Sequence, residues 1–177
     1  MEKVSDDYLK KYKLTYKNRD GNFKVYEAIS REDNLTPSTL GNKVSAVMIV
    51  PYVGDKILLS KEFRMAVNDW VYNFPAGLVD KGETIEEAAV RELKEETGLK
   101  VTKVVRVLSP SFSSVGISDE KIAIVIVEAE GEIVGSDNVN EEIESSLYTK
   151  EELINLINEC NSICSRTQLI GYWLTSK

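Results

Sequence analysis

The chain has 177 residues, 42% of them hydrophobic, which is enough for one globular domain with a substantial core. Its net charge of -7 argues against binding to a nucleic-acid backbone as the main activity. An acidic protein can still bind an anionic small molecule, because a bound divalent cation inverts the local field.

The chain shows no sign of a secretory or membrane segment. The first ten residues, MEKVSDDYLK, contain no apolar core of a signal peptide. The longest wholly apolar run, residues 122–127, is far too short to span a bilayer. We therefore expect a cytoplasmic protein without a membrane or nucleic-acid partner.

The N-terminal part is expected to form a β-hairpin. Two β-prone runs within residues 14–31 flank the turn Asp20-Gly21-Asn22. A polar stretch with Pro37 and Gly41 follows and is the best candidate for a boundary. The sequence thus predicts a hairpin extension over residues 1–40 and a main domain over residues 41–177.

The main domain alternates between predicted strands and helices. Apolar and β-branched runs predict strands, with Gly54-Asp55 as a turn between the first two, over residues 44–52, 56–63, 69–74, 101–108, 121–127 and 143–148. Helical patterns predict helices over residues 84–97, 150–160 and 165–174. Mixed strands with helices on either side favour an α/β sandwich.

The helix predicted over residues 84–97 directs two carboxylates toward its apolar face. With Ile85 at zero and about 100° per residue, Ala89 lies near 40° and Leu93 near 80°. On the same scale, Glu92 lies near 340° and Glu96 near 20°, between the apolar positions. A surface helix would keep such groups in water.

Converging carboxylates repel one another unless a cation lies among them. Glu95 flanks Glu92 and Glu96, and oxygen ligands without His or Cys suit Mg²⁺ or Mn²⁺. This predicts a metal site for a phosphorylated ligand. The alternative is a solvated helix face on which Arg91 pairs with Glu95 or Glu87.

The spacing of these residues resembles the Nudix box, which is Gly, five residues, Glu, seven residues, then Arg-Glu-apolar-any-Glu-Glu-any-Gly-apolar. Every defined position matches, with Gly77, Glu83, Arg91-Glu92-Leu93, Glu95-Glu96 and Gly98-Leu99. A chance match at one site is on the order of one in 10⁸ from average residue frequencies. The chain is therefore identified as a member of the Nudix hydrolase family.

The flanking sequence is similar to one branch of that family, the ADP-ribose pyrophosphatases. The shared features are Pro75-Ala76-Gly77, Phe63-Arg64, the loop 116–121, the acidic segment 140–143 and the N-terminal hairpin. Many members carry Glu just before the apolar-Pro-Ala-Gly stretch, where this chain has Asn73. This departure leaves the identity of the sugar open.

The resemblance implies a Nudix-type α/β/α sandwich with a mixed sheet and a role for each box residue. Metal ligation would come from Glu92 and Glu96, assisted by Glu95 and the backbone carbonyl of Ala76. Arg91 would orient a box glutamate. Gly77 and Gly98 would permit backbone turns that a β-carbon hinders.

The resemblance also places further residues around the substrate. A general base is expected from a late loop, with Glu141 first, Glu142 second and Glu120 as a weaker alternative. The candidates for an aromatic or guanidinium platform that recognises adenine are Tyr26, Arg31 and Arg64, with core packing as the alternative for Tyr26. A homodimer is implied, in which Tyr26 or Arg31 could act on the partner's site.

Three hypotheses for the function follow. The first is Mg²⁺-dependent hydrolysis of ADP-ribose to AMP and ribose 5-phosphate. The second is the same chemistry on another nucleoside diphosphate sugar or a dinucleotide. The third is a Nudix-fold sensor that binds a nucleotide without catalysis, which the complete box disfavours.

Overall fold

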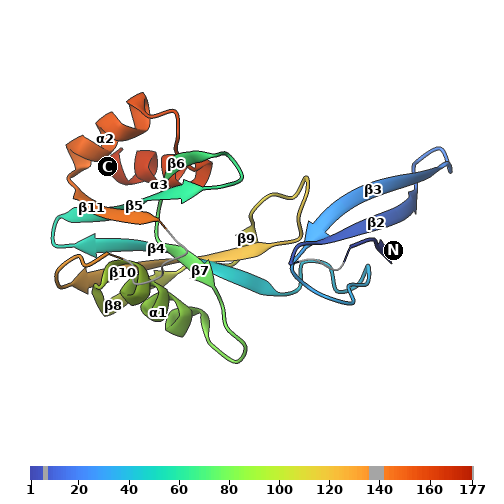
Figure 1. Cartoon of the computed structure of the whole chain (residues 1–177), viewed down its shortest axis with the longest axis horizontal. Helices are drawn as coiled ribbons and strands as arrows, with labels where there is room; N and C mark the ends of the chain where they lie inside the picture. Colours follow the sequence, from blue (N-terminus) through green and yellow to red (C-terminus); the bar gives the residue numbers. More distant parts are fainter. Residues whose placement is uncertain (6–7, 136–141, 177) are drawn as a thin grey trace. The chain divides into compact units, whose positions relative to one another are not determined.

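The computed structural model describes residues 1–5, 8–135 and 142–176 (Figure 1). The chain forms two compact units. One consists of Met1–Ala46 with Pro110–Ala123, and the other of Val47–Ser109 with Ile124–Lys177. The domain boundary predicted after residue 40 remains a prediction. The first compact unit extends to Ala46 and also includes Pro110–Ala123, which lies far from the N-terminal segment in the sequence.

The first unit is built on the predicted hairpin, which the structure confirms. Strands β1 (Glu2–Lys3), β2 (Lys10–Lys17) and β3 (Phe23–Ser30) form an antiparallel sheet, and Gly21 takes a φ of +81° in the turn. Tyr12 anchors this sheet, because its ring is buried and its hydroxyl donates to the carbonyl of Glu32 at 2.6 Å. The distant segment joins through the Ile29 amide, which donates to the carbonyl of Ile117 at 2.8 Å.

The larger sheet has eight strands. Its main order is β11-β5-β4-β10-β8, with β6 beside β5, β7 beside β4 and β9 beside β10. Figure 1 shows the arrows of β4 and β10 pointing the same way, whereas β5 runs antiparallel to β4, β6 and β11. The strands are β4 (Val44–Val53), β5 (Lys56–Arg64), β6 (Asp69–Asn73), β7 (Ala76–Leu78), β8 (Lys100–Val107), β9 (Ser111–Phe112), β10 (Lys121–Glu130) and β11 (Ile143–Tyr148).

The centre of this sheet forms the core of the second unit. In β4 the side chains from Val47 to Val50 are at most 1% exposed, and Leu58 and Leu59 of β5 are equally buried. A strand that reads as a continuous apolar run is covered on both faces, as the sequence predicted for residues 44–52.

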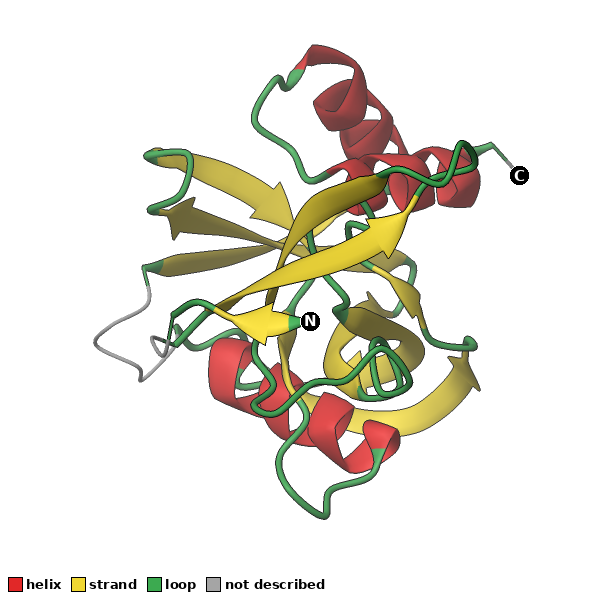
Figure 2. Ribbon diagram, turned by 90° about the vertical axis from the view of Figure 1, so that its right-hand side faces the viewer, coloured by secondary structure: helices red, strands yellow, loops and turns green. Residues whose placement is uncertain are grey.

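Helices cover the sheet from two sides (Figure 2). Helix α1 (Ile85–Thr97) packs on β7 and β8, while α2 (Lys150–Glu159) and α3 (Ser165–Thr175) pack on each other near β11 and β6. This arrangement confirms the predicted α/β sandwich with a mixed sheet.

The element bounds differ from the predicted ones by at most three residues, and the capping residues explain the clearest case. Thr84, predicted to open the first helix, is its N-cap: its hydroxyl accepts the Glu87 amide at 3.2 Å, and the Glu87 carboxylate accepts the Thr84 amide at 2.8 Å. No helix in the described part of the chain combines the length and the apolar composition needed to cross a membrane.

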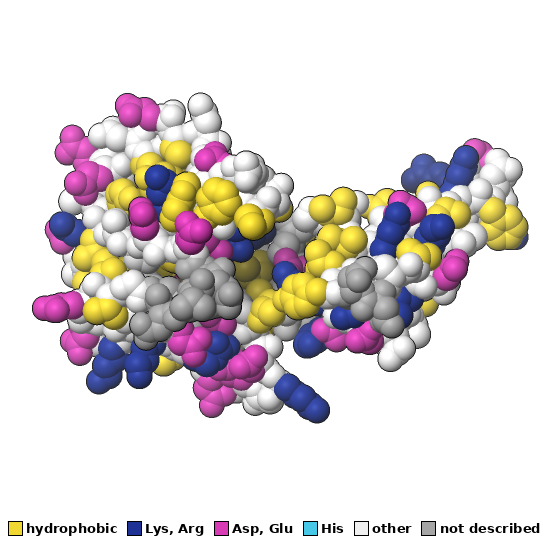
Figure 3. Space-filling view, in the orientation of Figure 1, with side chains coloured by type: hydrophobic (Ala, Val, Ile, Leu, Met, Phe, Trp, Pro, Cys, Tyr) yellow, Lys and Arg dark blue, Asp and Glu magenta, His cyan; other side chains and the backbone are white. Residues whose placement is uncertain are grey.

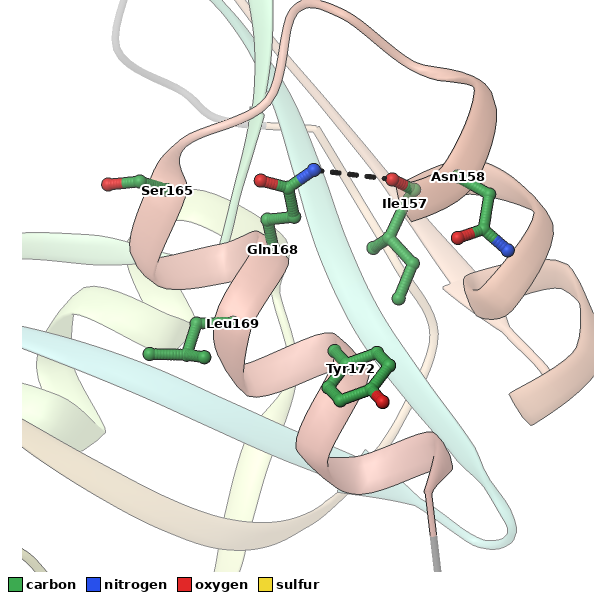
Figure 4. Close-up of a pocket in the computed structure, with 6 residues that line it drawn as sticks. All are labelled: Ile157, Asn158, Ser165, Gln168, Leu169 and Tyr172. Carbon is green, nitrogen blue, oxygen red and sulfur yellow. Dashed lines mark hydrogen bonds between the residues drawn. The ribbon is translucent and has the colours of Figure 1, made fainter.

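Helices α2 and α3 leave a hollow of about 280 Å³ between them (Figure 4). The Gln168 side chain donates to the Ile157 carbonyl across it at 3.4 Å. The lining residues are Ile157, Asn158, Ser165, Gln168, Leu169 and Tyr172. None of them is an acidic or basic residue, which makes the hollow a poor site for phosphate chemistry.

Candidate active site

Helix α1 directs carboxylates inward, as its phase predicted. Ala88, Ala89 and Leu93 are fully buried, and Glu96, on the same side of the helix, is only 8% exposed. The Glu92 side chain is 14% exposed, whereas that of Glu95 is 60% exposed. Glu92 and Glu96 therefore do not belong to a solvated face, while Glu95 lies at its edge.

The helix is fixed at both ends, which sets the position of these carboxylates. The capping box at Thr84 ends the loop before it, and Gly98 ends the helix in the left-handed conformation with a φ of +76°. The Gly98 amide donates to the Lys94 carbonyl at 2.8 Å. A β-carbon at Gly98 would also lie 2.2 Å from the Val134 side chain. Both the positive φ and this close contact therefore favour glycine at this position.

Arg91 lies at the centre of the acidic residues. Its guanidinium donates to both carboxylate oxygens of Glu83, each at 2.9 Å. It also donates to Glu92 at 2.8 Å and to Glu95 at 3.2 Å. A further bond of 2.9 Å reaches the backbone carbonyl of Leu78, the last residue of β7. The pairing of Arg91 with box glutamates, which the family resemblance implied, is thus present.

This network changes the protonation equilibria of its members. The hydrogen bond from Arg91 lowers the pKa of Glu83, and the Asp80 amide, which donates to the same carboxylate at 3.0 Å, lowers it further. The hydrogen bonds to Glu83 raise the pKa of Arg91 further above its ordinary value. Both groups therefore stay charged, and the network holds across the physiological pH range.

Gly77 provides the surface on which Glu92 rests. A β-carbon at Gly77 would lie 1.9 Å from the Glu92 carboxyl carbon and about as close to both oxygens. The carboxylate therefore lies directly against the backbone of β7, which only glycine permits. The strand itself is held from behind, because the Ile49 amide donates to the Pro75 carbonyl at 2.8 Å.

The donor atoms suit a hard divalent cation, because they are carboxylate and backbone oxygens. The bare backbone at Gly77 lets the Glu92 carboxylate lie against strand β7, to which Ala76 also belongs. In residues 1–5, 8–135 and 142–176, however, no three acidic or Cys side chains are gathered as a ready metal cluster. Arg91 already holds one oxygen of Glu92 and one of Glu95.

On the face shown in Figure 3, acidic and basic side chains lie next to one another where Figure 1 places α1 and the loop before it. This mixed surface agrees with a network in which a guanidinium and carboxylates neutralise one another.

The structure describes one of the two predicted late-loop acids. Glu141 lies outside the described residues. Glu142 is described, and its carbonyl accepts the Phe63 amide at 3.1 Å. It therefore lies beside the end of β5, where Arg64 forms an ion pair with Glu62 at 2.6 Å. The Arg64 side chain remains about half exposed.

Tyr26, Arg31 and Glu120 lie in the first compact unit. The Tyr26 hydroxyl donates to the Gly116 carbonyl, and Arg31 donates to the Glu120 carboxylate at 3.2 Å. The Arg31 guanidinium also lies over the ring of Tyr8, 5.0 Å from its centre. The structure therefore joins Arg31 to Glu120 and Tyr26 to the loop that precedes Glu120, and the roles of all three toward the substrate remain predictions.

Sequence reasoning missed one residue next to β7. Thr167 of α3 is fully buried and bonds to both Asn73 and Phe74, just before the Pro75-Ala76-Gly77 segment. A threonine in an amphipathic helix more than ninety residues away carries no local signal of such a contact.

Comparison with known proteins supports the family. The family model of the NUDIX domain matches residues 42–162. The chain is 30% identical over 166 residues to putative nudix hydrolase 2 of Caenorhabditis elegans, covering 89% of this chain and 74% of that protein. It is 33% identical over 121 residues to the ADP-ribose pyrophosphatase of Saccharomyces cerevisiae, covering 67% of this chain and 51% of that protein.

Two further similarities concern adenosine diphosphate chemistry. The ADP-sugar pyrophosphatase of Mus musculus is 34% identical over 98 residues, which cover 52% of this chain and 43% of that protein. The crystal structure of an ADP compounds hydrolase superposes with a TM-score of 0.77 at 25% identity. The superposed region covers 99% of this chain and 91% of the chain in that crystal structure.

The lowered pKa of Glu83 predicts how stability depends on pH. A carboxylate whose pKa is lower in the folded chain stabilises the fold above its ordinary value of 4.5, and this contribution is lost as the pH falls through the folded value. Replacing Glu83 with Gln should therefore destabilise the protein at pH 7. The destabilisation should shrink steadily toward about pH 3.

Urea unfolding of wild type and Glu83→Gln at several pH values measures this. Glu86→Gln is the matched control, because Glu86 is an exposed glutamate in the first turn of α1, three residues from Glu83. A Glu83→Gln effect that stays constant between pH 7 and about pH 3 would contradict the prediction.

Proposed function

Because the chain belongs to the Nudix family, we propose that it is a hydrolase that cleaves the pyrophosphate bond of ADP-ribose, giving AMP and ribose 5-phosphate. The observation that carries this proposal is the pair of inward-facing carboxylates on α1, Glu92 and Glu96, of which Glu92 is held by Arg91 and lies against the backbone of β7. Such an arrangement suits the stabilisation of charge on a pyrophosphate rather than a purely structural role.

The substrate class is supported by the similar proteins. The yeast and mouse relatives are named for ADP-ribose and ADP-sugar hydrolysis, and the similar solved structure for ADP compounds. An adenosine diphosphate joined to a sugar is the chemistry that they share. ADP-ribose is our specific proposal within that class.

Nudix hydrolases generally use divalent metal ions, and a bound Mg²⁺ or Mn²⁺ would supply charge neutralisation on the phosphate oxygens and activation of a water molecule. We propose that Glu92 and Glu96 would hold the ion, with assistance from Glu95 and the Ala76 carbonyl. Arg91 donates to one oxygen of Glu92 and to one oxygen of Glu95, and these bonds fix the orientation of both carboxylates.

The chain's own residues have separate tasks in this proposal. Arg91 fixes the orientation of Glu92 and holds Leu78, so that the helix and β7 keep one spacing. Gly77 keeps the approach to Glu92 open. Glu141 or Glu142 would accept the proton of the attacking water, and Arg64, half exposed beside Glu142, would contact a phosphate.

A different nucleoside diphosphate sugar or a dinucleotide remains the alternative substrate. Asn73 stands where many members of the resembling branch have Glu, and its side-chain oxygen accepts the Thr167 hydroxyl at 2.9 Å. A residue engaged in this way is less available to contact a sugar, which favours testing several substrates together.

Release of AMP from ADP-ribose with Mg²⁺ tests the proposal, beside a panel of nucleotide sugars and dinucleotides. We expect a clear preference for ADP-ribose. Glu96→Gln should reduce turnover by about a hundredfold or more while the protein stays folded, because it removes a ligand charge and keeps the side-chain volume. Preferred cleavage of another panel member would support the proposed site and contradict ADP-ribose as the substrate. Nucleotide binding by folded protein that cleaves nothing would instead indicate a sensor.

Gly77→Ala tests the contact between the strand and Glu92. The new methyl group would occupy the position of the Glu92 carboxyl, which must then move away from β7. We expect turnover to fall by about a hundredfold with little loss of stability, because Glu92 is the flexible end of a side chain. Gly116→Ala is the matched control, since a β-carbon there meets nothing within 4 Å. Wild-type activity in Gly77→Ala would refute the contact's importance.

We also propose a homodimer. Strands β2 and β3 and the segment 110–123 leave large apolar side chains exposed, among them Phe23, Val25, Val115 and Ile117. Sedimentation should give about twice the chain mass of 19.9 kDa, and Phe23→Asp should shift the protein toward the monomer. Leu169→Asp, also at an exposed apolar position, is the control. A fully active monomeric wild type would overturn this proposal.

A further inference from the structure

Thr167 ties helix α3 to the strand segment that lies under the candidate site. It is fully buried in the first turn of α3. The Phe74 amide donates to its hydroxyl oxygen at 3.3 Å, and the hydroxyl in turn donates to the Asn73 side-chain oxygen at 2.9 Å. The single hydroxyl therefore satisfies one backbone group and one side chain at the end of β6.

The attachment of α3 to β6 gives Thr167 a fixed position. The Tyr72 amide donates to the Ser162 carbonyl at 2.9 Å, and the Cys164 amide donates to the Tyr72 carbonyl at 2.9 Å. Residues 162–164 thus pair with β6 immediately before α3 begins. Thr167 follows within one helical turn, so its hydroxyl cannot move far from Phe74.

The residues that follow Phe74 form the surface under Glu92. Pro75 is held by the Ile49 amide at 2.8 Å, Gly77 lies against the Glu92 carboxyl, and Leu78 accepts a bond from Arg91 at 2.9 Å. Thr167 therefore fixes the beginning of a segment whose end is fixed by Arg91. A shift at Phe74 would change where the Ala76 and Gly77 backbone lies relative to Glu92.

We propose that Thr167 is a positioning residue for the hydrolysis proposed above, acting through Phe74 on the backbone of residues 76–78. This proposal rests on that function. Thr167 lies beyond residue 162, where the match to the NUDIX domain ends. Helix α3 would then be a support that this chain places behind the carboxylate site, rather than a peripheral addition.

Two variants separate the hydroxyl from the volume of the side chain. Thr167→Val keeps the shape and removes both hydrogen bonds, whereas Thr167→Ser keeps the hydroxyl. We expect Thr167→Val to lower kcat for ADP-ribose at least tenfold and to change KM less than threefold. Thr167→Ser should keep most of the wild-type kcat.

A second readout follows the strand directly. Hydrogen exchange of the backbone amides of residues 76–78 should be faster in Thr167→Val than in wild type, and near wild type in Thr167→Ser. Ile157→Ala is the matched control, because Ile157 is buried in α2 where it packs against α3 and takes no part in the bonds to Phe74. It should lower the melting temperature and leave kcat and the exchange of residues 76–78 near wild type.

The outcomes distinguish this inference from the proposed function. If wild type does not cleave ADP-ribose, the proposed function fails, and the exchange data alone decide whether Thr167 holds the strand. If wild type is active and Thr167→Val keeps its kcat, the positioning role is overturned, whatever the melting temperature. An equal loss of kcat in Ile157→Ala would overturn it as well, because general loosening of α3 would then explain the effect.

Discussion

The guanidinium of Arg91 is the interaction on which the candidate site depends. Arginine has five N–H donors in a planar fork, and the structure shows five hydrogen bonds from this side chain. They join the loop before the helix through Glu83, the helix itself through Glu92 and Glu95, and the strand end through Leu78. A lysine has three donors and no planar geometry, so it could not make this set of bonds.

The charge of this centre is compatible with the metal ion proposed for it. One guanidinium faces Glu83, Glu92 and Glu95, and buried Glu96 adds a further carboxyl group one turn along the helix. The negative charge therefore exceeds the positive charge even with every Arg91 donor in use. A divalent cation stabilises such a site more than a second side chain would, because it carries two charges and accepts several oxygens at once.

Local sequence predicted those features whose physical cause is local. The helix limits follow from the Thr84 cap and from Gly98, and the burial of Glu96 follows from helical phase. Arg91 and Glu95 have the ordinary helical spacing of four residues, so their ion pair could be predicted. Glu83 precedes the helix. The resemblance to the Nudix box singled out Glu83 but did not indicate its bond to Arg91. The joining of residues 110–123 with the N-terminal hairpin and the contact of Thr167 with Phe74 depend on tertiary packing, for which neither segment carries a pattern.

The residues proposed for metal binding and those proposed for substrate recognition differ in the same way, because the first set is local in the sequence and the second is not. The groups proposed to hold the metal ion lie within residues 76–98, so one helix and one strand fix them together. The proposed general base and the proposed substrate contacts come from β3 and the residue after it, from the end of β5 and from the segment around Glu142. Substitutions in those places leave the network of Arg91 untouched. Chains that share this network can therefore differ in their substrate contacts. Asn73, which accepts a hydrogen bond from Thr167 and stands where many members of the resembling branch have Glu, is one position of such a difference.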